Sequence, residues 1–215
     1  MKVISLWSGG KDSCFACYKA RAQGHAIVSL VNFTDPGGEG SVSHGLSAAI
    51  IKRQADMANI PFMQRPMPRS GYRDAFLSLI QEFKERESVE GVVFGDIYLQ
   101  EHRDWIDSVC ADAHVEAILP IWTRDTERLI KAIIGSGFRS IIVSVKKEIL
   151  GEEWLGREID GASVEELRAM GGIDLCGEKG EFHTFVYDGP LFREAVRFKK
   201  GKKRLEGGRW FLEID

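Results

Sequence analysis

Short apolar runs alternate with helical patterns through the first half of the chain. Runs typical of buried strands lie at residues 3–6, 26–33, 61–63, 91–94 and 117–119. Patterns typical of helices lie between them, at residues 13–23, 46–58, 72–86 and 100–113. Because a strand leads through a helix to another strand four times, we predict an α/β fold. It has a five-stranded, mostly parallel sheet with helices on both faces.

The pattern changes after Pro120. Helical patterns cover residues 125–134 and 163–170, and the second begins with Ser163 and Glu166 at the spacing of a capping box. Strand-like runs follow at residues 140–145, 184–187, 195–198 and 210–214, and a charged hairpin turn is predicted at residues 199–203. We therefore divide the chain into a domain at residues 1–122 and a smaller C-terminal α+β subdomain at residues 123–215.

A glycine-rich loop, S-G-G-K-D-S, joins the first predicted strand to the first predicted helix. Its glycines let the backbone approach an anion closely, and the N–H groups at the helix start favour a phosphate. Lys11 adds positive charge, and Asp12 beside a phosphate suggests a magnesium ion. The alternative is a structural role, in which the glycine-rich turn binds no ligand and only caps the helix. The candidate nucleotide-binding residues are Ser8, Gly9, Gly10, Lys11, Asp12 and Ser13.

Further candidate residues follow the second and fourth predicted strands. Ligands of parallel sheets bind beyond the carboxyl ends of the strands, where Asp96 is expected to lie. Arg103 can form a planar fork to a carboxylate or phosphate, although an exposed ion pair with Asp104 or Asp107 is an alternative. His44 could contact nucleotide or substrate, but a lone loop histidine is more often structural.

Composition narrows the class of protein. The chain has 215 residues, of which 44% are hydrophobic and 28% charged, with a net charge of -3. These values are ordinary for a soluble globular protein and give no strong nucleic-acid signal. For the basic residues at 199–204, a solvated hairpin is favoured over a patch that docks an acidic or RNA-bound partner. Neither a signal peptide nor a transmembrane helix is recognisable, so we expect no membrane association and a cytoplasmic location.

Cysteine spacing offers one more motif. Cys14 and Cys17 form a single C-x-x-C within the first predicted helix. A zinc site would need two further ligands at organised spacing. We favour packing against the core, because residues three apart on a helix share a face.

The loop S-G-G-K-D-S is the motif of the PP-loop N-type ATP pyrophosphatases, whose members share a five-stranded parallel sheet of the HUP type and mostly cleave ATP to AMP and pyrophosphate. Three further segments resemble the diphthine–ammonia ligase family, and the resemblance extends over about residues 1–192. The segments are residues 95–110, residues 120–129 with 154–156, and C-G-E-K-G-E-F-H-T at residues 176–184 with D-G-P at 188–190.

This resemblance implies an ATP-dependent amide ligase that adenylates a carboxylate, releases pyrophosphate and amidates with ammonium, using ATP and Mg2+. Its acceptor would be diphthine on elongation factor 2, or a small-molecule carboxylate where the source organism makes no diphthamide. A homo-oligomer is compatible with this interpretation. The alternatives are another PP-loop enzyme, such as a tRNA-thiolation enzyme, and a non-catalytic ATP-binding module.

The resemblance also implies roles for residues. Glu178 and Glu181 flank Gly180 and could hold ammonium or magnesium, or orient substrate. From the residues alone we would favour a structural role, in which one of the two glutamates only ties a loop to backbone amides. The resemblance reverses that preference in favour of a functional role. The implied catalytic residues are Lys11, Asp12, Glu178 and Glu181. The implied substrate-binding residues are Asp96, Arg103, His44, Gly180, His183 and Thr184.

Overall fold

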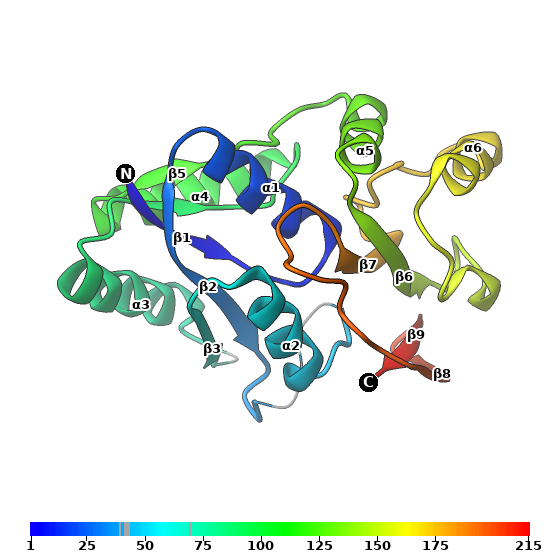
Figure 1. The fold of residues 1–215 in the computed structure, drawn as a ribbon, viewed down its shortest axis with the longest axis horizontal. Coiled ribbons are helices and arrows are strands. Elements are labelled where there is room, and N and C mark those ends of the chain that lie inside the picture. Colours follow the sequence, from blue (N-terminus) through cyan, green and yellow to red (C-terminus); the bar gives the residue numbers. More distant parts are fainter. Residues whose placement is uncertain (39, 41–43, 69) are drawn as a thin grey trace.

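The predicted five-stranded sheet is present in the computed structural model, which describes residues 1–38, 40, 44–68 and 70–215. All neighbouring strands are parallel, in the order β3-β2-β1-β4-β5 (Figure 1). The strands are β1 (Lys2–Leu6), β2 (Ala26–Thr34), β3 (Phe62–Pro66), β4 (Gly91–Val93) and β5 (Glu116–Ile118). This order confirms the α/β prediction and places a reversal of winding between β1 and β4.

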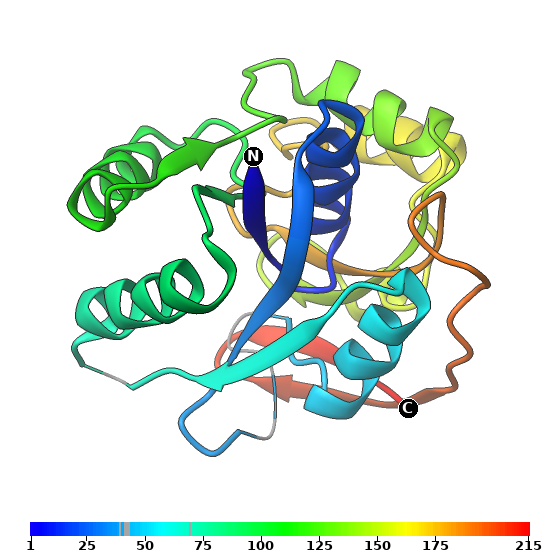
Figure 2. The ribbon, with the colours of Figure 1, turned by 60° about the vertical axis from the view of Figure 1, so that its left-hand side comes forward.

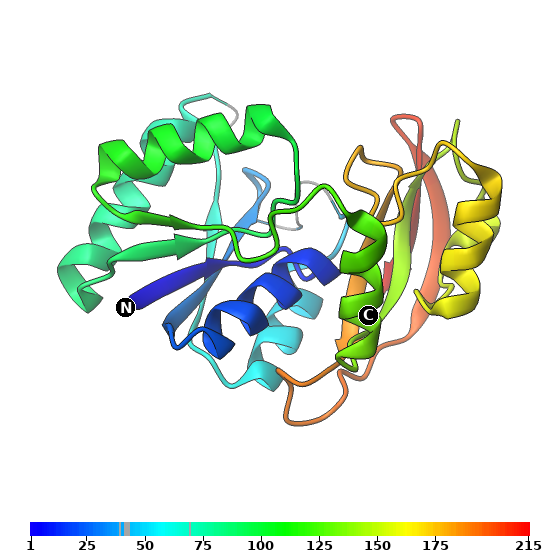
Figure 3. The same ribbon diagram turned by 90° about the horizontal axis from the view of Figure 1, so that it is seen from above.

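Helices cover both faces of this sheet. Helices α1 (Lys11–Ala22) and α2 (Ala48–Ala58) lie on one face, and α3 (Tyr72–Glu87) and α4 (Gln100–Ala113) lie on the other (Figure 3). Successive strand residues point to opposite faces, so Val3 joins the hydrophobic cluster under α1 and α2. Its neighbour Ile4 joins the cluster under α3 and α4.

The second half of the chain forms a four-stranded antiparallel sheet in the order β7-β6-β9-β8. This second sheet lies beyond the carboxyl ends of the strands of the first sheet (Figure 3). Its elements are α5 (Thr126–Gly135), β6 (Arg139–Lys146), the 3-10 helix η1 (Glu152–Trp154), α6 (Gly161–Met170), β7 (Phe182–Asp188), β8 (Lys200–Glu206) and β9 (Arg209–Ile214). Buried side chains from both halves, such as Val3 and Phe185, belong to one hydrophobic cluster. Because the two halves share this cluster, their packing does not mark a boundary between two domains. The division between residues 122 and 123 remains a prediction.

Two predicted elements near the C-terminus are wrong. Residues 195–198 form no strand, and the preceding segment runs beside α2, where the Arg193 N–H donates to the Met57 carbonyl at 2.9 Å (Figures 1 and 2). The lysine-rich residues expected in a turn instead form most of β8, and the turn lies at Gly207 and Gly208, where φ is 56° and 78°. Among the described strands, β8 pairs with β9 alone, and lysines are common on such edge strands.

The predicted capping box of α6 begins one turn earlier than expected. Asp160 is the N-cap, and its side chain accepts from the Ser163 N–H at 2.8 Å. The Ser163 hydroxyl accepts from the Asp160 N–H in return, at 2.9 Å. Glu166, expected in the box, instead pairs with Arg157.

The C-x-x-C motif packs as predicted. Cys14 and Cys17 are fully buried in the cluster between α1 and the sheet. Burial raises the pKa of Cys17 to about 11, so its thiol stays protonated at neutral pH.

Candidate active site

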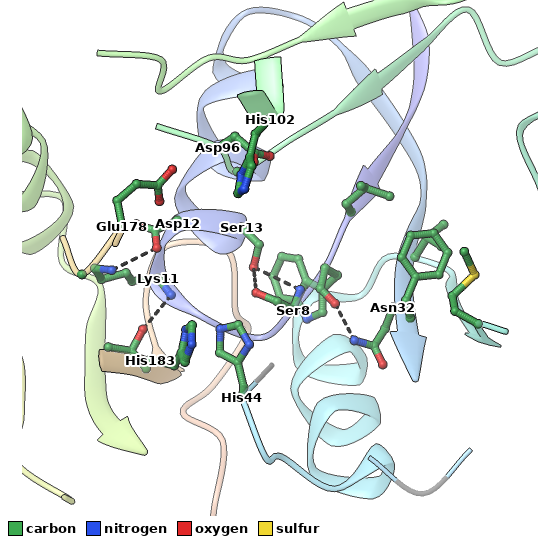
Figure 4. A pocket seen from close by; sticks show the side chains of 18 of the residues that line it. Ser8, Lys11, Asp12, Ser13, Asn32, His44, Asp96, His102, Glu178 and His183 are labelled. Carbon is green, nitrogen blue, oxygen red and sulfur yellow. Dashed lines mark hydrogen bonds and ion pairs between the residues drawn. The ribbon is translucent and has the colours of Figure 1, made fainter. Parts of the chain in front are cut away.

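A cavity of about 800 Å³ opens at the carboxyl ends of β1, β2 and β4 (Figure 4). Its size is within the range of small-molecule sites. The loops that follow β1 and β4 flank the reversal of winding, where open α/β sheets bind their ligands. Polar residues that line it are Ser8, Lys11, Asp12, Ser13, Asn32, Asp35, His44, Tyr72, Asp96, His102, Glu178, His183 and Thr184.

The loop after β1 closes on itself before α1 begins. The Ser8 and Ser13 hydroxyls lie 3.0 Å apart, and the Ser13 hydroxyl donates to the Gly10 carbonyl at 3.0 Å. Gly9 has a φ of 83°, which favours glycine. A Cβ on Gly10 would lie 2.7 Å from Nε2 of His44, so glycine lets this imidazole pack directly against the loop. The loop thus brings the N-terminus of α1, where an anion is favoured, to the edge of the cavity that Ser8, Asp12 and Ser13 line.

Strand β7 holds this loop from the other side. The Val186 N–H donates to the Gly9 carbonyl at 3.0 Å, and the Lys11 N–H donates to the Thr184 hydroxyl at 3.0 Å. The Lys11 ammonium donates to the Cys176 carbonyl. The two sequence motifs, separated by about 165 residues, therefore form one site.

Gln54, on α2, also joins the loop after β1 to β7, and the sequence analysis did not predict this role. Its side chain is 0% exposed. Its amide NH2 donates to the carbonyls of Gly9, at 2.9 Å, and Val186, at 2.6 Å. Its oxygen accepts from the Trp7 indole N–H at 2.7 Å. The available signal was a polar residue within the apolar stripe of α2, between Ile51 and Ala55.

Lys11 is the buried cation of the site. Its side chain is 2% exposed, and its ammonium lies 2.9 Å from Oδ2 of Asp12. Burial lowers the pKa of Lys11, but the acidic groups around it, Asp12 first and then Cys176 and Glu178, together outweigh burial and leave the pKa raised. Lys11 therefore stays charged at neutral pH.

Three side chains from separate segments converge opposite Lys11 (Figure 4). Asp96 follows β4, His102 lies in the first turn of α4, and Glu178 comes from the glycine-rich segment before β7. His102 Nδ1 lies 2.9 Å from Oδ1 of Asp96, and Glu178 Oε1 accepts from the Ile97 N–H at 3.1 Å. Their potential ligand atoms all lie within 4.8 Å of one another. Burial raises the pKa of Glu178 to about 7, and the charges of Asp12 and Asp96 add to this.

His44 and His183 lie beside the glycine-rich loop at residues 8–13, the phosphate loop, with ring centroids 4.6 Å apart and the rings tilted by 44°. Burial lowers the pKa of His44 to about 4, with further contributions from Lys11 and Arg209. Burial, then His44 and Arg209, lowers the pKa of His183 to about 2. Both imidazoles are therefore neutral at pH 7.

This pair predicts a steep loss of stability in acid. Both pKa values are lower in the folded chain than the ordinary 6.5, so the stabilisation is complete above that pH. As pH falls toward 4, the unfolded chain binds more protons, and each imidazole costs about 1.4 kcal/mol per pH unit. Urea unfolding at several pH values should show a shallower slope for His183→Gln than for the unaltered chain. His114→Asn, which removes an exposed imidazole, should keep the original slope. Equal slopes for all three proteins would contradict this account.

Five of the predicted site residues do not line the cavity: Gly9 and Gly10 of the loop after β1, and Arg103, Gly180 and Glu181. Glu181 is 2% exposed, and its Oε1 accepts from the Asp174 N–H at 2.9 Å, as the loop-tie alternative expects. The Gly180 carbonyl accepts from Arg209 at 2.7 Å. Arg103 pairs with Asp107 at 2.8 Å, and its guanidinium lies over the Trp122 ring. Instead, its neighbour His102, which was not predicted, lies at the cavity.

The strand order of the parallel sheet, and a glycine-rich loop with a buried lysine at its reversal of winding, define an α/β protein with a candidate anion-binding site. The model of the diphthamide synthase N-terminal domain matches residues 1–117, and that of the diphthamide synthase C-terminal domain matches residues 125–215. The chain belongs to the diphthamide synthase family, as its motifs predicted.

Curated relatives carry one name. Proteins named diphthine–ammonia ligase from Danio rerio and Homo sapiens are 27% and 28% identical to this chain. Both matches cover 91% of this chain, and they cover 86% and 82% of the relatives. A relative of the same name from Schizosaccharomyces pombe is 26% identical over 91% of this chain and 36% of its own length.

One solved structure is similar at a lower level. It is described as a predicted subunit of tRNA methyltransferase from Methanocaldococcus jannaschii, with a TM-score of 0.46 and 14% identity. The match covers 91% of this chain and 100% of that one, but a likeness of this size does not bear on function. Among the described residues, no helix is both long and apolar enough to cross a membrane.

Proposed function

We propose that this chain is an ATP-dependent amide ligase that adenylates the carboxylate of diphthine on elongation factor 2 and then amidates it with ammonium. The name diphthine–ammonia ligase, carried by relatives that match 91% of the chain, supports the reaction and the acceptor. The observation that carries the proposal is the contact between the two motifs. Lys11 of the phosphate loop binds the Cys176 carbonyl and the Thr184 hydroxyl of the second motif.

In the first step, a carboxylate oxygen of the acceptor attacks the α-phosphorus of ATP. The bond between this phosphorus and the oxygen that bridges to the β-phosphorus breaks, and pyrophosphate leaves with the electron pair. Negative charge grows on the leaving group, and the Lys11 ammonium and the backbone at the start of α1 are placed to stabilise it. The apolar side of the cavity, with Val31, Phe33 and Met67, suits the adenine base.

In the second step, the nitrogen of ammonia attacks the carbonyl carbon of the acyl adenylate. AMP leaves with the electron pair of the broken bond, and the protons that nitrogen loses pass to solvent. His44 and His183 are neutral at pH 7, so neither imidazole adds positive charge beside the phosphate loop in this step.

The residues at the cavity fit a magnesium ion. Asp96, His102 and Glu178 would hold it, because their ligand atoms are close enough to share one ion. Oδ1 of Asp12 is buried and has no hydrogen-bond partner among the described residues, so it can serve a cation directly or through water. When bound, the ion supplies positive charge to the phosphate oxygens.

Manganese, which prefers the same oxygen ligands and is visible by electron paramagnetic resonance, tests this assignment. Asp96→Asn should weaken Mn2+ binding by about tenfold or more, because it replaces a charged ligand with a neutral amide. Asp112→Asn, at an exposed position near the end of α4, is the matched control and should bind as the unaltered chain does. Unchanged affinity in Asp96→Asn would contradict the assignment.

The nucleotide product tests the proposed reaction. The chain is incubated with ATP, Mg2+ and ammonium, with and without elongation factor 2 that carries diphthine. We expect AMP and pyrophosphate that depend on both the acceptor and ammonium. Formation of ADP would exclude adenylation, and AMP formed only with another carboxylate would exclude diphthine while keeping the ligase.

A further inference from the structure

The segment that carries Glu178 lacks regular secondary structure. Residues 171–181 join α6 to β7 and form neither helix nor strand. The segment includes Gly177 and Gly180, whose φ values are 72° and 80°. Because glycine loses more conformational freedom on folding than any other residue, contacts with neighbouring side chains must hold this segment in one conformation.

Asp174 is the centre of these contacts, because all four of its polar groups are hydrogen-bonded. Its Oδ1 accepts from the Cys176 N–H at 2.7 Å, and its carbonyl accepts from the Gly177 N–H at 2.9 Å. Its own N–H donates to Oε1 of Glu181 at 2.9 Å. Its Oδ2 accepts from the Tyr98 hydroxyl at 3.0 Å. Asp174 therefore joins the two ends of the segment to each other and to a residue outside it.

Tyr98 belongs to the loop after β4, which also carries Asp96. Burial, and then the hydrogen bond to Asp174, raise the pKa of Tyr98, so its hydroxyl stays protonated and donates. The neighbouring Ile97 N–H donates to Oε1 of Glu178 at 3.1 Å. Two adjacent residues of this loop thus hold the glycine-rich segment.

Two groups of the site depend on this arrangement. Cys176, whose N–H bonds to Asp174, presents its carbonyl to the Lys11 ammonium. Glu178 follows two residues later, and its carboxylate lies within 4.8 Å of the Asp96 carboxylate. Asp174 itself does not line the cavity, so it can act on the reaction only through groups that do.

We propose that Asp174 is a positioning residue for the reaction: with Tyr98 and Glu181, it fixes where the Glu178 carboxylate and the Cys176 carbonyl lie. This role rests on the ligase function proposed above, whereas the placement of Glu178 is a property of the chain that can be measured without turnover. Glu181, a predicted catalytic residue, thereby acts through Asp174 rather than on the substrate.

The Ile97 amide proton reports where Glu178 lies, because the Ile97 N–H donates to the Glu178 carboxylate. Asp174→Ala removes both side-chain contacts, so in NMR spectra of the full chain we expect this proton to shift upfield and to exchange with solvent about tenfold faster. Mn2+ affinity and the rate of AMP formation should each fall about tenfold, as is common when a metal ligand loses its support. An unchanged Ile97 signal with unchanged Mn2+ affinity in folded Asp174→Ala would overturn the proposal.

Asp174→Asn separates position from charge. Its amide oxygen can still accept from the Cys176 N–H, and its NH2 group can donate to the Tyr98 hydroxyl, which accepts as well as donates. Because both hydrogen bonds are kept, we expect Mn2+ affinity and the rate of AMP formation to stay within about twofold of the unaltered chain. A loss as large as that in Asp174→Ala would assign the effect to charge and overturn the proposal.

Tyr98→Phe tests the other end of the contact. We expect a several-fold loss of Mn2+ affinity, and no further loss when Tyr98→Phe is added to Asp174→Ala, because the two residues act as a unit. Additive losses would contradict this. The matched controls are Tyr18→Phe, which removes a hydroxyl from a ring packed on Phe15, and Asp56→Ala, which removes an exposed carboxylate from α2. Both should bind Mn2+ and form AMP as the unaltered chain does.

Thermal unfolding and AMP formation separate the possible failures. If Asp174→Ala is only less stable, and when folded binds Mn2+ and forms AMP normally, Asp174 serves folding alone and the positioning role is wrong, while the ligase stands. If the Ile97 signal and Mn2+ affinity change as expected but the unaltered chain forms no AMP with any carboxylate, the placement of Glu178 by Asp174 stands and the ligase is wrong.

Discussion

Lys11→Met lowers the rate of AMP formation about a thousandfold. The substitution removes the buried ammonium beside the phosphate loop, which the reaction needs as charge grows on pyrophosphate. In a water-excluded site, one such group contributes a factor of about a hundred to a thousand to the rate. The loss should appear in the rate at saturating ATP, which single-turnover measurements of AMP can follow.

Loss of folding must be separated from loss of chemistry, because Lys11→Met also leaves Asp12 without its partner. The double substitution Lys11→Met with Asp12→Asn removes this unpaired charge and should regain stability but not activity. Lys52→Met, which breaks an exposed ion pair with Asp56, is the matched control and should keep full activity. Turnover in folded Lys11→Met equal to that of the control would remove Lys11 from the mechanism.

Gln54→Leu lowers the free energy of unfolding by about 4 kcal/mol. The substitution leaves the carbonyls of Gly9 and Val186 and the Trp7 indole N–H without the partner that Gln54 provides. A buried polar group that loses its partner costs about 1–3 kcal/mol. The midpoint of urea unfolding measures this loss, and ATP binding should weaken as well because Gly9 belongs to the phosphate loop.

Gln81→Leu is the control for this prediction. Gln81 is exposed on α3 and bonds only to Glu85, four residues along the helix, among the described contacts. Its replacement should change the free energy of unfolding by less than about 0.5 kcal/mol. If Gln54→Leu unfolded at the same urea concentration as this control, the three hydrogen bonds would not hold β7 to the loop.

The first sheet could be predicted because its strands are buried on both faces. Such strands appear as continuous apolar runs, like Val3 and Ile4, and the intervening helices give a contrasting period. Strand β8 could not be predicted in this way. It lies at a sheet edge with most of its side chains exposed, so no apolar period marks it.

The local part of the site could also be predicted, but its distant contacts could not. The phosphate loop is contiguous, and Asp96 follows a strand that ends at the same edge of the sheet. Gln54, however, acquires its role from Val186, 132 residues away, which no local pattern indicates. On α4, adjacent residues point about 100° apart, so sequence alone did not show that His102 rather than Arg103 lies at the cavity.

The central claim is that the acceptor carboxylate attacks the α-phosphorus of ATP at the loop that carries Lys11. Isotope transfer tests this most directly. Elongation factor 2 bearing diphthine with ¹⁸O in its carboxylate is incubated with the chain, ATP, Mg2+ and ammonium, and the products are analysed by mass spectrometry. The account predicts one ¹⁸O atom in the phosphate of AMP for each amide formed. Recovery of the label in inorganic phosphate, with ADP as the nucleotide product, would contradict it.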